Sequence, residues 1–371
     1  MSKVLVVDDS ALMRRLLSTV LTQEGHEVTT ARNGLEGVER LLEWQPDVVT
    51  LDINMPEMDG LTALSQMMQA RPTPVVMVSS LTERGAQATI EALALGAVDF
   101  IAKPGGTISL SIDDIAVQLR QKVRAAARSQ TRAASGRPVV VRQEPAAPVR
   151  SPVPARSATS LRAPRGTTAT GTAPGTGSVP GLVLIGVSTG GPRTLEDILP
   201  LLPADFPWPV LIAQHMPGNF THAFAQRMDR LCQLEVCEAG TQMPIESGRI
   251  YIGRGDTDMV VVERMGRLVV QPRPETPGHP WHPSVDVMVD SALRVMPAER
   301  LVGVLLTGMG YDGARAMTEL KAAGGRTIAE SESTSVVFGM PSELIERGGA
   351  SVVLPSGDVT RQLRHWIQKT A

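Results

Sequence analysis

The segment LVLIGVSTGG, residues 182–191, has the form of a strand that delivers a polar side chain to the edge of a sheet. An apolar run precedes Ser188, and glycines flank it on both sides. Two later segments have the same form: VLIAQ ends at His215, and LVGVLLTGMGYDG leads to Asp312. Because the carboxyl ends of parallel strands share one edge of an open sheet, we expect Ser188, His215 and Asp312 to converge on one crevice.

A hydroxyl, an imidazole and a carboxylate are the groups needed for acyl transfer, since a serine is a weak nucleophile until a base removes its proton. Each residue alone has an ordinary alternative. A glycine-rich turn after a strand is typical of a helix cap or a phosphate cradle, a lone histidine is commonly structural, and an aspartate among glycines forms turns. The coincidence of all three favours catalysis. Their chain order differs from that of the α/β-hydrolases, which indicates a separate solution to the same chemistry.

Length and composition predict two globular domains. The chain has 371 residues, more than the roughly 250–300 at which a single core stops growing. Hydrophobic residues make up 42% and charged residues 20%, an ordinary globular mixture. No apolar run approaches the roughly 18 residues of a membrane span, so we expect a cytoplasmic protein without a secretory signal or membrane insertion. Two cysteines without a paired motif indicate neither a disulfide framework nor a zinc site.

A basic stretch separates the two expected domains. Between residues 119 and 180 there are eleven lysines or arginines, one acidic residue and no aromatic residue. From residue 135 onward Pro, Ala, Arg, Thr, Gly and Ser dominate, a composition that cannot bury a core. We therefore expect a flexible linker over 123–180. Its charge suits nucleic acid, but the absence of stacking aromatics and of a groove-binding motif favours a solvated tether and no specific nucleic-acid partner.

The first half, residues 1–122, alternates apolar runs with amphipathic segments. This is the βα pattern of a flavodoxin-like sheet with five strands, which we place at VLVVDD, EVTTA, DVVTLDI, PVVMVSS and AVDFIAKP. Polar side chains follow the first, third, fourth and fifth runs: Asp8 and Asp9, Asp52, Ser79, and Lys103. Clustered carboxylates repel one another unless a cation joins them, and such oxygen ligands suit Mg²⁺. A carboxylate can also accept a phosphoryl group.

Through VVDDS, LDINMPEMDG, VSS and FIAKP, this half resembles a response-regulator receiver domain. The resemblance implies a function for each matching position. Asp52 matches the phosphoacceptor, and Mg²⁺ would be held by Asp8, Asp9, Asp52 and the backbone carbonyl of Asn54. The switch positions are the Ser79 hydroxyl, the aromatic Phe100 and the phosphate-sensing Lys103. A histidine kinase is implied as the phosphodonor.

The second half, residues 181–371, again alternates strands and helices, which predicts a doubly wound, mostly parallel α/β domain. We expect strands at LVLIGV, PVLIAQ, RIYIG, DMVVVE, RLVV, LVGVLL, RTIAE and ASVVL. RLVV follows DMVVVE across a three-residue turn, so these two are expected to form an antiparallel hairpin beside the main sheet.

Through IGVSTGGP, QHMP, SGRIYIG, PSVDVM, LLTGMGYDGA and VVFGMPSELI, this half resembles the chemotaxis protein-glutamate methylesterase and glutamine deamidase family, whose catalytic domain follows a receiver. By that resemblance Ser188 is the nucleophile, His215 the general base and Asp312 its orienting residue. Thr189 and the backbone amide of Met309 would steady the site and the oxyanion.

The resemblance also implies the reaction and its control. Glutamate γ-methyl esters on the cytoplasmic helices of chemoreceptors would be hydrolysed without a cofactor in the catalytic domain, often together with deamidation of receptor glutamines. The receiver would cover the crevice until Asp52 is phosphorylated. The sequence leaves open the receptor, the kinase and whether glutamine is a substrate. Trp281 and Tyr311 depart from the family pattern, which frequently has histidine and asparagine there.

Single features of the sequence are also compatible with two other classes of function. A response regulator with a nucleic-acid-binding output would use the basic linker, and a nucleotide-binding oxidoreductase would use the glycine-rich turn at 186–191. The first lacks a recognition-helix pattern, and the second lacks the G-x-G-x-x-G fingerprint.

Overall fold

The structure is a computed structural model that describes residues 1–103, 112–133 and 179–368. Its first half contains a five-stranded parallel sheet in the order β2-β1-β3-β4-β5. The central strands β3 and β4 are buried along their whole length, as their continuous apolar runs predict. The strands are β1 (Lys3–Val7), β2 (Glu27–Ala31), β3 (Val48–Asp52), β4 (Val75–Ser79) and β5 (Asp99–Ala102). The five strands expected from the sequence are confirmed.

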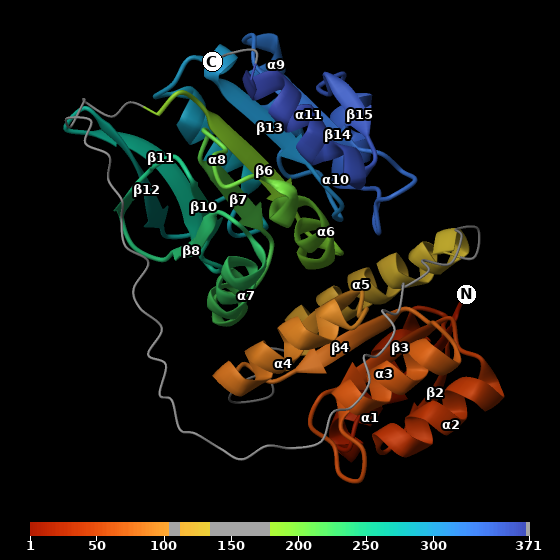
Figure 1. The fold of residues 1–371 in the computed structure, drawn as a ribbon. Helices are drawn as coiled ribbons and strands as arrows, with labels where there is room; N and C mark the ends of the chain where they lie inside the picture. Colours follow the sequence, from red (N-terminus) through yellow and green to blue (C-terminus); the bar gives the residue numbers. More distant parts are fainter. Residues whose placement is uncertain (104–111, 134–178, 369–371) are drawn as a thin grey trace, which may run out of the picture.

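Helices cover both faces of this sheet (Figure 1). Each of the helices α1 to α4 begins at a polar residue whose side chain accepts a hydrogen bond from the N–H three residues on, which fixes the start of the helix. The helices are α1 (Ala11–Gln23), α2 (Gly34–Trp44), α3 (Gly60–Ala70), α4 (Glu83–Ala94) and α5 (Ile112–Ala133).

Helix α5 continues beyond residue 122, where the sequence analysis places the start of the linker. The physical reason is burial: Val123 and Ala126 are fully buried in the cluster that joins α5 to α1 and the sheet. The first part of the expected linker is therefore helical, and residues 134–178 lie outside the described residues.

The second half is built on a seven-stranded sheet in the order β15-β14-β13-β6-β7-β10-β8, and all of its strand pairs are parallel. The strands are β6 (Leu182–Val187), β7 (Val210–Gln214), β8 (Glu235–Ala239), β10 (Arg249–Gly253), β13 (Leu301–Leu305), β14 (Arg326–Glu330) and β15 (Val352–Leu354). The edge strand β8 was not predicted, because its sequence EVCEA carries two glutamates and is only partly buried.

A separate three-stranded antiparallel sheet lies beside the main one, in the order β11-β12-β9. Its strands are β9 (Met243–Pro244), β11 (Asp258–Arg264) and β12 (Arg267–Arg273). The pairing of β11 with β12 across Met265 and Gly266 confirms the expected hairpin.

Two groups of helices sandwich the main sheet, as a doubly wound fold requires. Apolar side chains of α6, α7 and α11 pack on one face, and those of α8, α9 and α10 pack on the other. The helices are α6 (Gly191–Ile198), α7 (Gly218–Leu231), α8 (Val285–Leu293), α9 (Ala314–Ala322), α10 (Met340–Glu346) and α11 (Ser356–Gln368), with the short 3-10 helices η2 (Leu199–Leu201) and η3 (Ala298–Arg300). Among the described residues, every helix is too short or too polar to cross a lipid bilayer.

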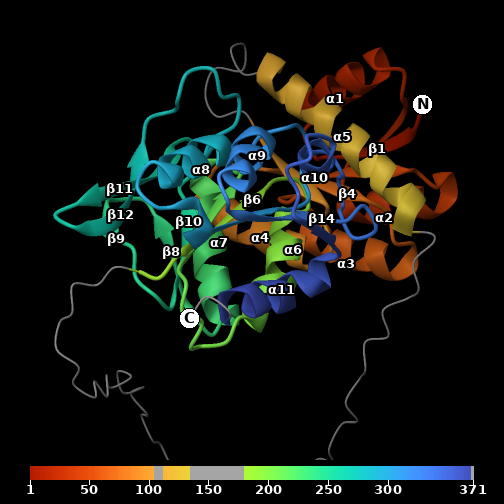
Figure 2. The same ribbon diagram turned by 90° about the horizontal axis from the view of Figure 1, so that it is seen from above.

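The two halves contact each other through α4 of the first and α7 of the second, which lie side by side in both views (Figures 1 and 2). The rings of Phe100 and Phe220 meet there with centroids 4.3 Å apart. The amide nitrogen of Asn219 donates to the carbonyl of Leu81 at 3.2 Å. The hydroxyl of Thr189, just after β6, also contacts the first half, through Asp99 at the start of β5.

Candidate active site

The ends of three neighbouring strands build the site in the second half. In the order β13-β6-β7, Val187 pairs with Gln214, so Ser188 and His215 are the next residues along adjacent parallel strands. The backbone N–H of Ser188 donates to the carbonyl of Thr307, which follows β13, at 2.9 Å. The three segments picked out in the sequence therefore come together at one sheet edge.

His215 and Asp312 are directly hydrogen-bonded. The imidazole Nε2 lies 2.8 Å from Asp312 Oδ2, and both side chains are almost fully buried. Burial alone would raise the pKa of Asp312, but the hydrogen bond and charge of His215, with backbone donors, outweigh burial and lower it. An ionised Asp312 can only accept, which assigns the hydrogen to Nε2 and leaves the lone pair on Nδ1.

The N-terminus of α8 holds Asp312 from the other side. The hydroxyl of Ser284, the N-cap residue of α8, donates to Asp312 Oδ1 at 2.9 Å. The backbone N–H groups of Val285 and Asp286 donate at 2.6 and 3.1 Å. Free N–H groups and the helix dipole favour an anion at this end of a helix. The carboxylate thus has four donors and a fixed orientation.

Ser188 and His215 are neighbours without a hydrogen bond between their side chains. His215 Nδ1 is buried and has no hydrogen-bond partner among the described residues. Ser188 is half-buried against the backbone of Gly308, where a Cβ atom would come within 2.7 Å of the serine Cβ, so only glycine fits there. A nucleophile and its base commonly have looser geometry before substrate binds.

The two residues expected to support the oxyanion differ in their surroundings. The backbone N–H of Met309 donates to none of the residues that the structure describes. The hydroxyl of Thr189 instead donates to Asp99 Oδ2 of β5, in the first half, at 2.7 Å. Lys122 Nζ pairs with the other oxygen of Asp99 at 2.8 Å. The residue next to Ser188 is therefore bound to the other half of the molecule.

The carboxyl edge of the first sheet gathers the expected acidic cluster. Carboxylate oxygens of Asp8, Asp9 and Asp52 lie within 4.8 Å of one another. Lys103 Nζ lies 2.9 Å from Asp52 Oδ2 and 3.0 Å from Asp8 Oδ2. This set of hard oxygen donors, three carboxylates with one lysine between two of them, fits Mg²⁺.

Burial raises the pKa of Asp52, because the nearby Lys103 and a backbone hydrogen bond only partly offset desolvation and the charge of Asp8. For Lys103, burial works against the charged form, but hydrogen bonds and charges of Asp52 and Asp8 outweigh it and raise its pKa. An additional cation at this edge would stabilise the ionised forms of the clustered carboxyl groups.

The remaining predicted residues of the first half lie around this cluster. Asn54 is exposed in the loop after β3. The Ser79 hydroxyl is buried and turned toward α4, where Thr89 Oγ1 donates to it at 2.7 Å and it donates to the carbonyl of Gly85 at 3.2 Å. Phe100 is buried in the contact with Phe220.

Comparison with known proteins identifies the family. Residues 183–363 match the model of the CheB methylesterase, and residues 4–111 match the model of the response regulator receiver domain. "Protein-glutamate methylesterase/protein-glutamine glutaminase 3" of Rhodospirillum rubrum is 54% identical, covering 100% of this chain and 97% of that protein. The chain belongs to the CheB methylesterase family.

A second relative agrees. The protein-glutamate methylesterase/protein-glutamine glutaminase 2 of Rhodopseudomonas palustris is 50% identical over 99% of this chain and 98% of its own length. Among solved structures, the CheB methylesterase catalytic domain of Thermotoga maritima is 38% identical, with a TM-score of 0.48, and covers 50% of this chain and 97% of its own. The family is one of carboxylic ester hydrolases, which confirms the resemblance noted in the sequence.

Sequence reasoning missed three residues of this CheB site. Ser284 belongs to the motif PSVDVM, but no role was predicted for it from the sequence. A serine before an apolar helical segment is nevertheless a typical N-cap signal. Gln214 donates to the carbonyls of both Ser188 and His215 at 3.1 Å and so ties the two strand ends together. Asp99 gave no local signal, because its partner Thr189 lies 90 residues away.

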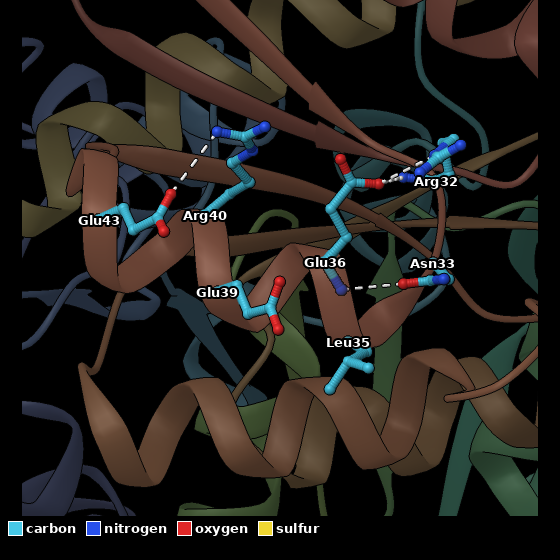
Figure 3. A pocket seen from close by; sticks show the side chains of 7 residues that line it. All are labelled: Arg32, Asn33, Leu35, Glu36, Glu39, Arg40 and Glu43. Carbon is cyan, nitrogen blue, oxygen red and sulfur yellow. Dashed lines mark hydrogen bonds and ion pairs between the residues drawn. The ribbon is translucent and has the colours of Figure 1, made fainter.

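A surface depression over α2 lies apart from both clusters (Figure 3). Its charged side chains pair with each other: Arg32 with Glu36 at 3.2 Å, and Arg40 with Glu43 at 3.5 Å. The side chain of Asn33 caps α2. Exposed pairs of this kind solvate a helix face, and we assign no chemistry to them.

Proposed function

We propose that this protein hydrolyses glutamate γ-methyl esters on chemoreceptor helices with Ser188, His215 and Asp312, under the control of phosphorylation at Asp52. The observation that carries the proposal is the buried hydrogen bond of 2.8 Å between His215 Nε2 and Asp312, beside the strand end that bears Ser188. The names of the relatives supply the substrate class, the glutamate methyl ester and the glutamine side chain.

In the first step, His215 Nδ1 takes the hydroxyl proton of Ser188 while Ser188 Oγ attacks the ester carbonyl. Asp312 stabilises the imidazolium that forms. The tetrahedral intermediate collapses when Nδ1 returns the proton to the departing methoxide, so methanol leaves and an acyl-serine remains. Water then attacks the acyl-serine, again losing a proton to Nδ1, which returns it to Ser188 Oγ as the acyl bond breaks; the glutamic acid formed ionises and releases its proton to solvent.

The free N–H of Met309 supports an oxyanion site next to Ser188. A single donor of this kind is typically worth about 3–4 kcal/mol in the transition state. Deamidation of receptor glutamines follows the same steps with ammonia as the leaving group, so it belongs to the same proposal. The chemistry needs no metal or organic cofactor in this half, because the base and the oxyanion donor are protein groups.

Control by the receiver is supported by the contact between the halves. The hydrogen bond between Thr189 and Asp99 fastens the residue next to the nucleophile to β5. The Ser79 hydroxyl, which would meet a phosphoryl group on Asp52, is bonded to Gly85 and Thr89 of α4, the helix that packs on α7.

Phosphorylation would draw Ser79 toward Asp52, where Lys103 already lies, and remove the Ser79 bonds from α4. The contact between α4 and α7 would then weaken and expose the crevice. Changing the closed-to-open ratio from 99:1 to 1:99 needs about 5.5 kcal/mol of differential stabilisation. Mg²⁺ held by Asp8, Asp9, Asp52 and Asn54 would neutralise phosphoryl charge in the transfer from a histidine kinase.

The decisive experiment measures methanol release from methylated receptor with the full-length protein. Ser188→Ala should lower the rate by about 10⁴–10⁶-fold, because the other two residues cannot act without a nucleophile. Ser333→Ala, which changes an exposed serine of the same half, is the matched control and should keep the rate of the unaltered protein. Equal release by Ser188→Ala and its control would rule out Ser188 as the nucleophile.

A further inference from the structure

We infer that Trp281 is a positioning residue for His215, acting through an aromatic stack on the face of the imidazole ring. The two rings are nearly parallel, with an interplanar angle of 3° and centroids 5.6 Å apart. That separation is within the roughly 6 Å over which an indole face attracts a cation. The inference rests on the proposed function, because it takes His215 as the base.

The hydrogen bond from the imidazole of His215 does not by itself fix the plane of the ring. Nε2 is anchored to Asp312, while Nδ1 has no partner among the described residues. One hydrogen bond fixes one atom of a ring and lets the ring tilt about that bond. Trp281 lies parallel to the imidazole in an offset stack, so it limits this tilt and sets the plane in which Nδ1 would meet the hydroxyl of Ser188.

Trp281 is itself held in place by residues around it. Tyr311 packs edge-on against the indole, with centroids 5.0 Å apart at an angle of 80°. Gly310 has a φ of +93°, and a Cβ there would lie 2.6 Å from the indole Cζ2, so glycine leaves the space that the ring fills. The next residue, His282, is fixed by a hydrogen bond of 2.9 Å from Nδ1 to Asp258.

One segment therefore orients both partners of the pair. Trp281 lies against the His215 ring, and Ser284, three residues later, donates to Asp312. The stack also acts in the reaction, because the imidazole becomes a cation when it takes the serine proton. An indole face stabilises that cation out of the ring plane, while Asp312 stabilises it in the plane.

The other titratable groups near the pair make hydrogen bonds that do not involve Trp281, and Tyr311 contacts it only through its ring. His279 and Asp286 have ligating atoms within 4.8 Å of those of Asp312, Asp256 accepts from the N–H of Gly218, and Asp99 contacts Thr189. Differences between variants at 281 consequently report the stack itself.

The first readout is the pH profile of kcat/KM for methanol release. Trp281→Leu should lower kcat about 2- to 30-fold and move the acid limb of the profile to lower pH by about 0.4–1.5 units, the range expected for a lost cation–π contact. The direction follows because an imidazole without the stack is harder to protonate and stays neutral at lower pH. Trp281→Phe, which keeps a ring, should recover most of both effects. A fall in kcat without movement of the acid limb, equal in both variants, would reduce Trp281 to a packing residue and overturn the inference.

The second readout needs no substrate. An imidazolium stacked on an indole quenches the fluorescence of the indole. The emission of Trp281, obtained as the difference between the unaltered protein and Trp281→Phe, should therefore fall as the pH is lowered. His215→Gln should abolish this pH dependence. Trp44→Leu, which removes a tryptophan from α2, should leave both the quenching and the acid limb unchanged. Quenching that persists in His215→Gln would overturn the inference.

The two readouts separate the inference from the proposed function. Activity retained in Ser188→Ala, with quenching intact, would refute the proposed chemistry and keep the stack. If Ser188→Ala loses activity, but Trp281→Leu leaves the acid limb unmoved and Trp281 shows no pH-dependent quenching, the stack is refuted and the proposed chemistry stands.

Discussion

Asp52, the last residue of β3, and Asp312, in the loop after β13, both lie at the carboxyl edge of a parallel sheet, yet their surroundings move their pKa values in opposite directions. Asp52 is buried beside Asp8 with Lys103 as its cation, and desolvation raises its pKa. Asp312 is also buried, but His215, Ser284 and the first N–H groups of α8 outweigh desolvation and lower its pKa. The same topological position thus yields two chemically different carboxylates.

The difference shows what a strand end does and does not supply. It brings a side chain to the crevice, while the groups that arrive from other elements decide its charge. In the first half those groups are other carboxylates and one lysine, an arrangement suited to receiving a cation and a phosphoryl group. In the second half a helix N-terminus completes an anion site, an arrangement suited to steadying a base through repeated turnover.

The largest expected effect tests the role of Asp312. Asp312→Asn should lower kcat by about 10⁴-fold, because an amide no longer fixes the tautomer or stabilises the imidazolium. Methanol release with saturating methylated receptor measures it. Asp205→Asn, in an exposed turn of the same half, is the control and should keep the rate. A loss of less than tenfold would contradict the assigned role.

A second substitution tests the role of the other carboxylate, Asp52, in activation. Asp52→Asn should abolish activation by acetyl phosphate and Mg²⁺ but retain basal methanol release, because the receiver would lose its acceptor while the catalytic half keeps its groups. Glu39→Gln, in the depression over α2, should activate normally. Undiminished activation of Asp52→Asn would remove this residue from the control scheme.

A smaller effect is expected where the two halves touch. Asp99→Ala should raise basal methanol release about 2- to 10-fold, the equivalent of one hydrogen bond that favours the closed state. Asn219→Ala removes a more exposed contact across the same interface and should have a smaller effect. If Asp99→Ala lowered or did not change the basal rate, the bond from Thr189 would not hold the crevice closed.

The smallest expected effect is on thermal stability, where Asp52→Asn and Asp312→Asn should have opposite effects. Asp52 has a raised pKa, so its charged form opposes folding at neutral pH, and Asp52→Asn should raise Tm in Mg²⁺-free buffer. Asp312 has a lowered pKa, so its charge stabilises the fold, and Asp312→Asn should lower Tm. Each kcal/mol corresponds to about 2–4 °C.

The Tm differences of Asp52→Asn and Asp312→Asn from the unaltered protein should both become smaller at acidic pH. The Asp52 effect should vanish as pH falls through its raised pKa toward the ordinary value, and the Asp312 effect should vanish only below that value. Calorimetry between pH 3 and pH 7 measures both; shifts of the same sign at neutral pH would contradict the comparison.

Most strands could be predicted because their signal is local. Buried parallel strands such as β3, β6 and β13 are continuous apolar runs, whereas the edge strand β8 mixes glutamates with apolar residues and gave no such signal. The boundary between the first half and the linker, expected at residue 122, lies within α5, because the last buried positions of this helix are small residues in a basic sequence.

The candidate site divides in the same way. Ser188, His215 and Asp312 each follow a recognisable strand, so they could be picked out from the sequence. Ser284 and Asp99 could not be assigned a contact, since their partners lie 28 and 90 residues away.

The sequence by itself determined the two α/β halves and the reactive residues at their strand ends, because apolar runs and the residues that end them are properties of short segments. Only the tertiary structure decided which imidazole nitrogen meets Asp312, that Ser79 turns toward α4, and that Asp99 binds Thr189. A side chain takes its direction and its charge from the neighbours that packing brings to it, and those neighbours come from distant parts of the chain.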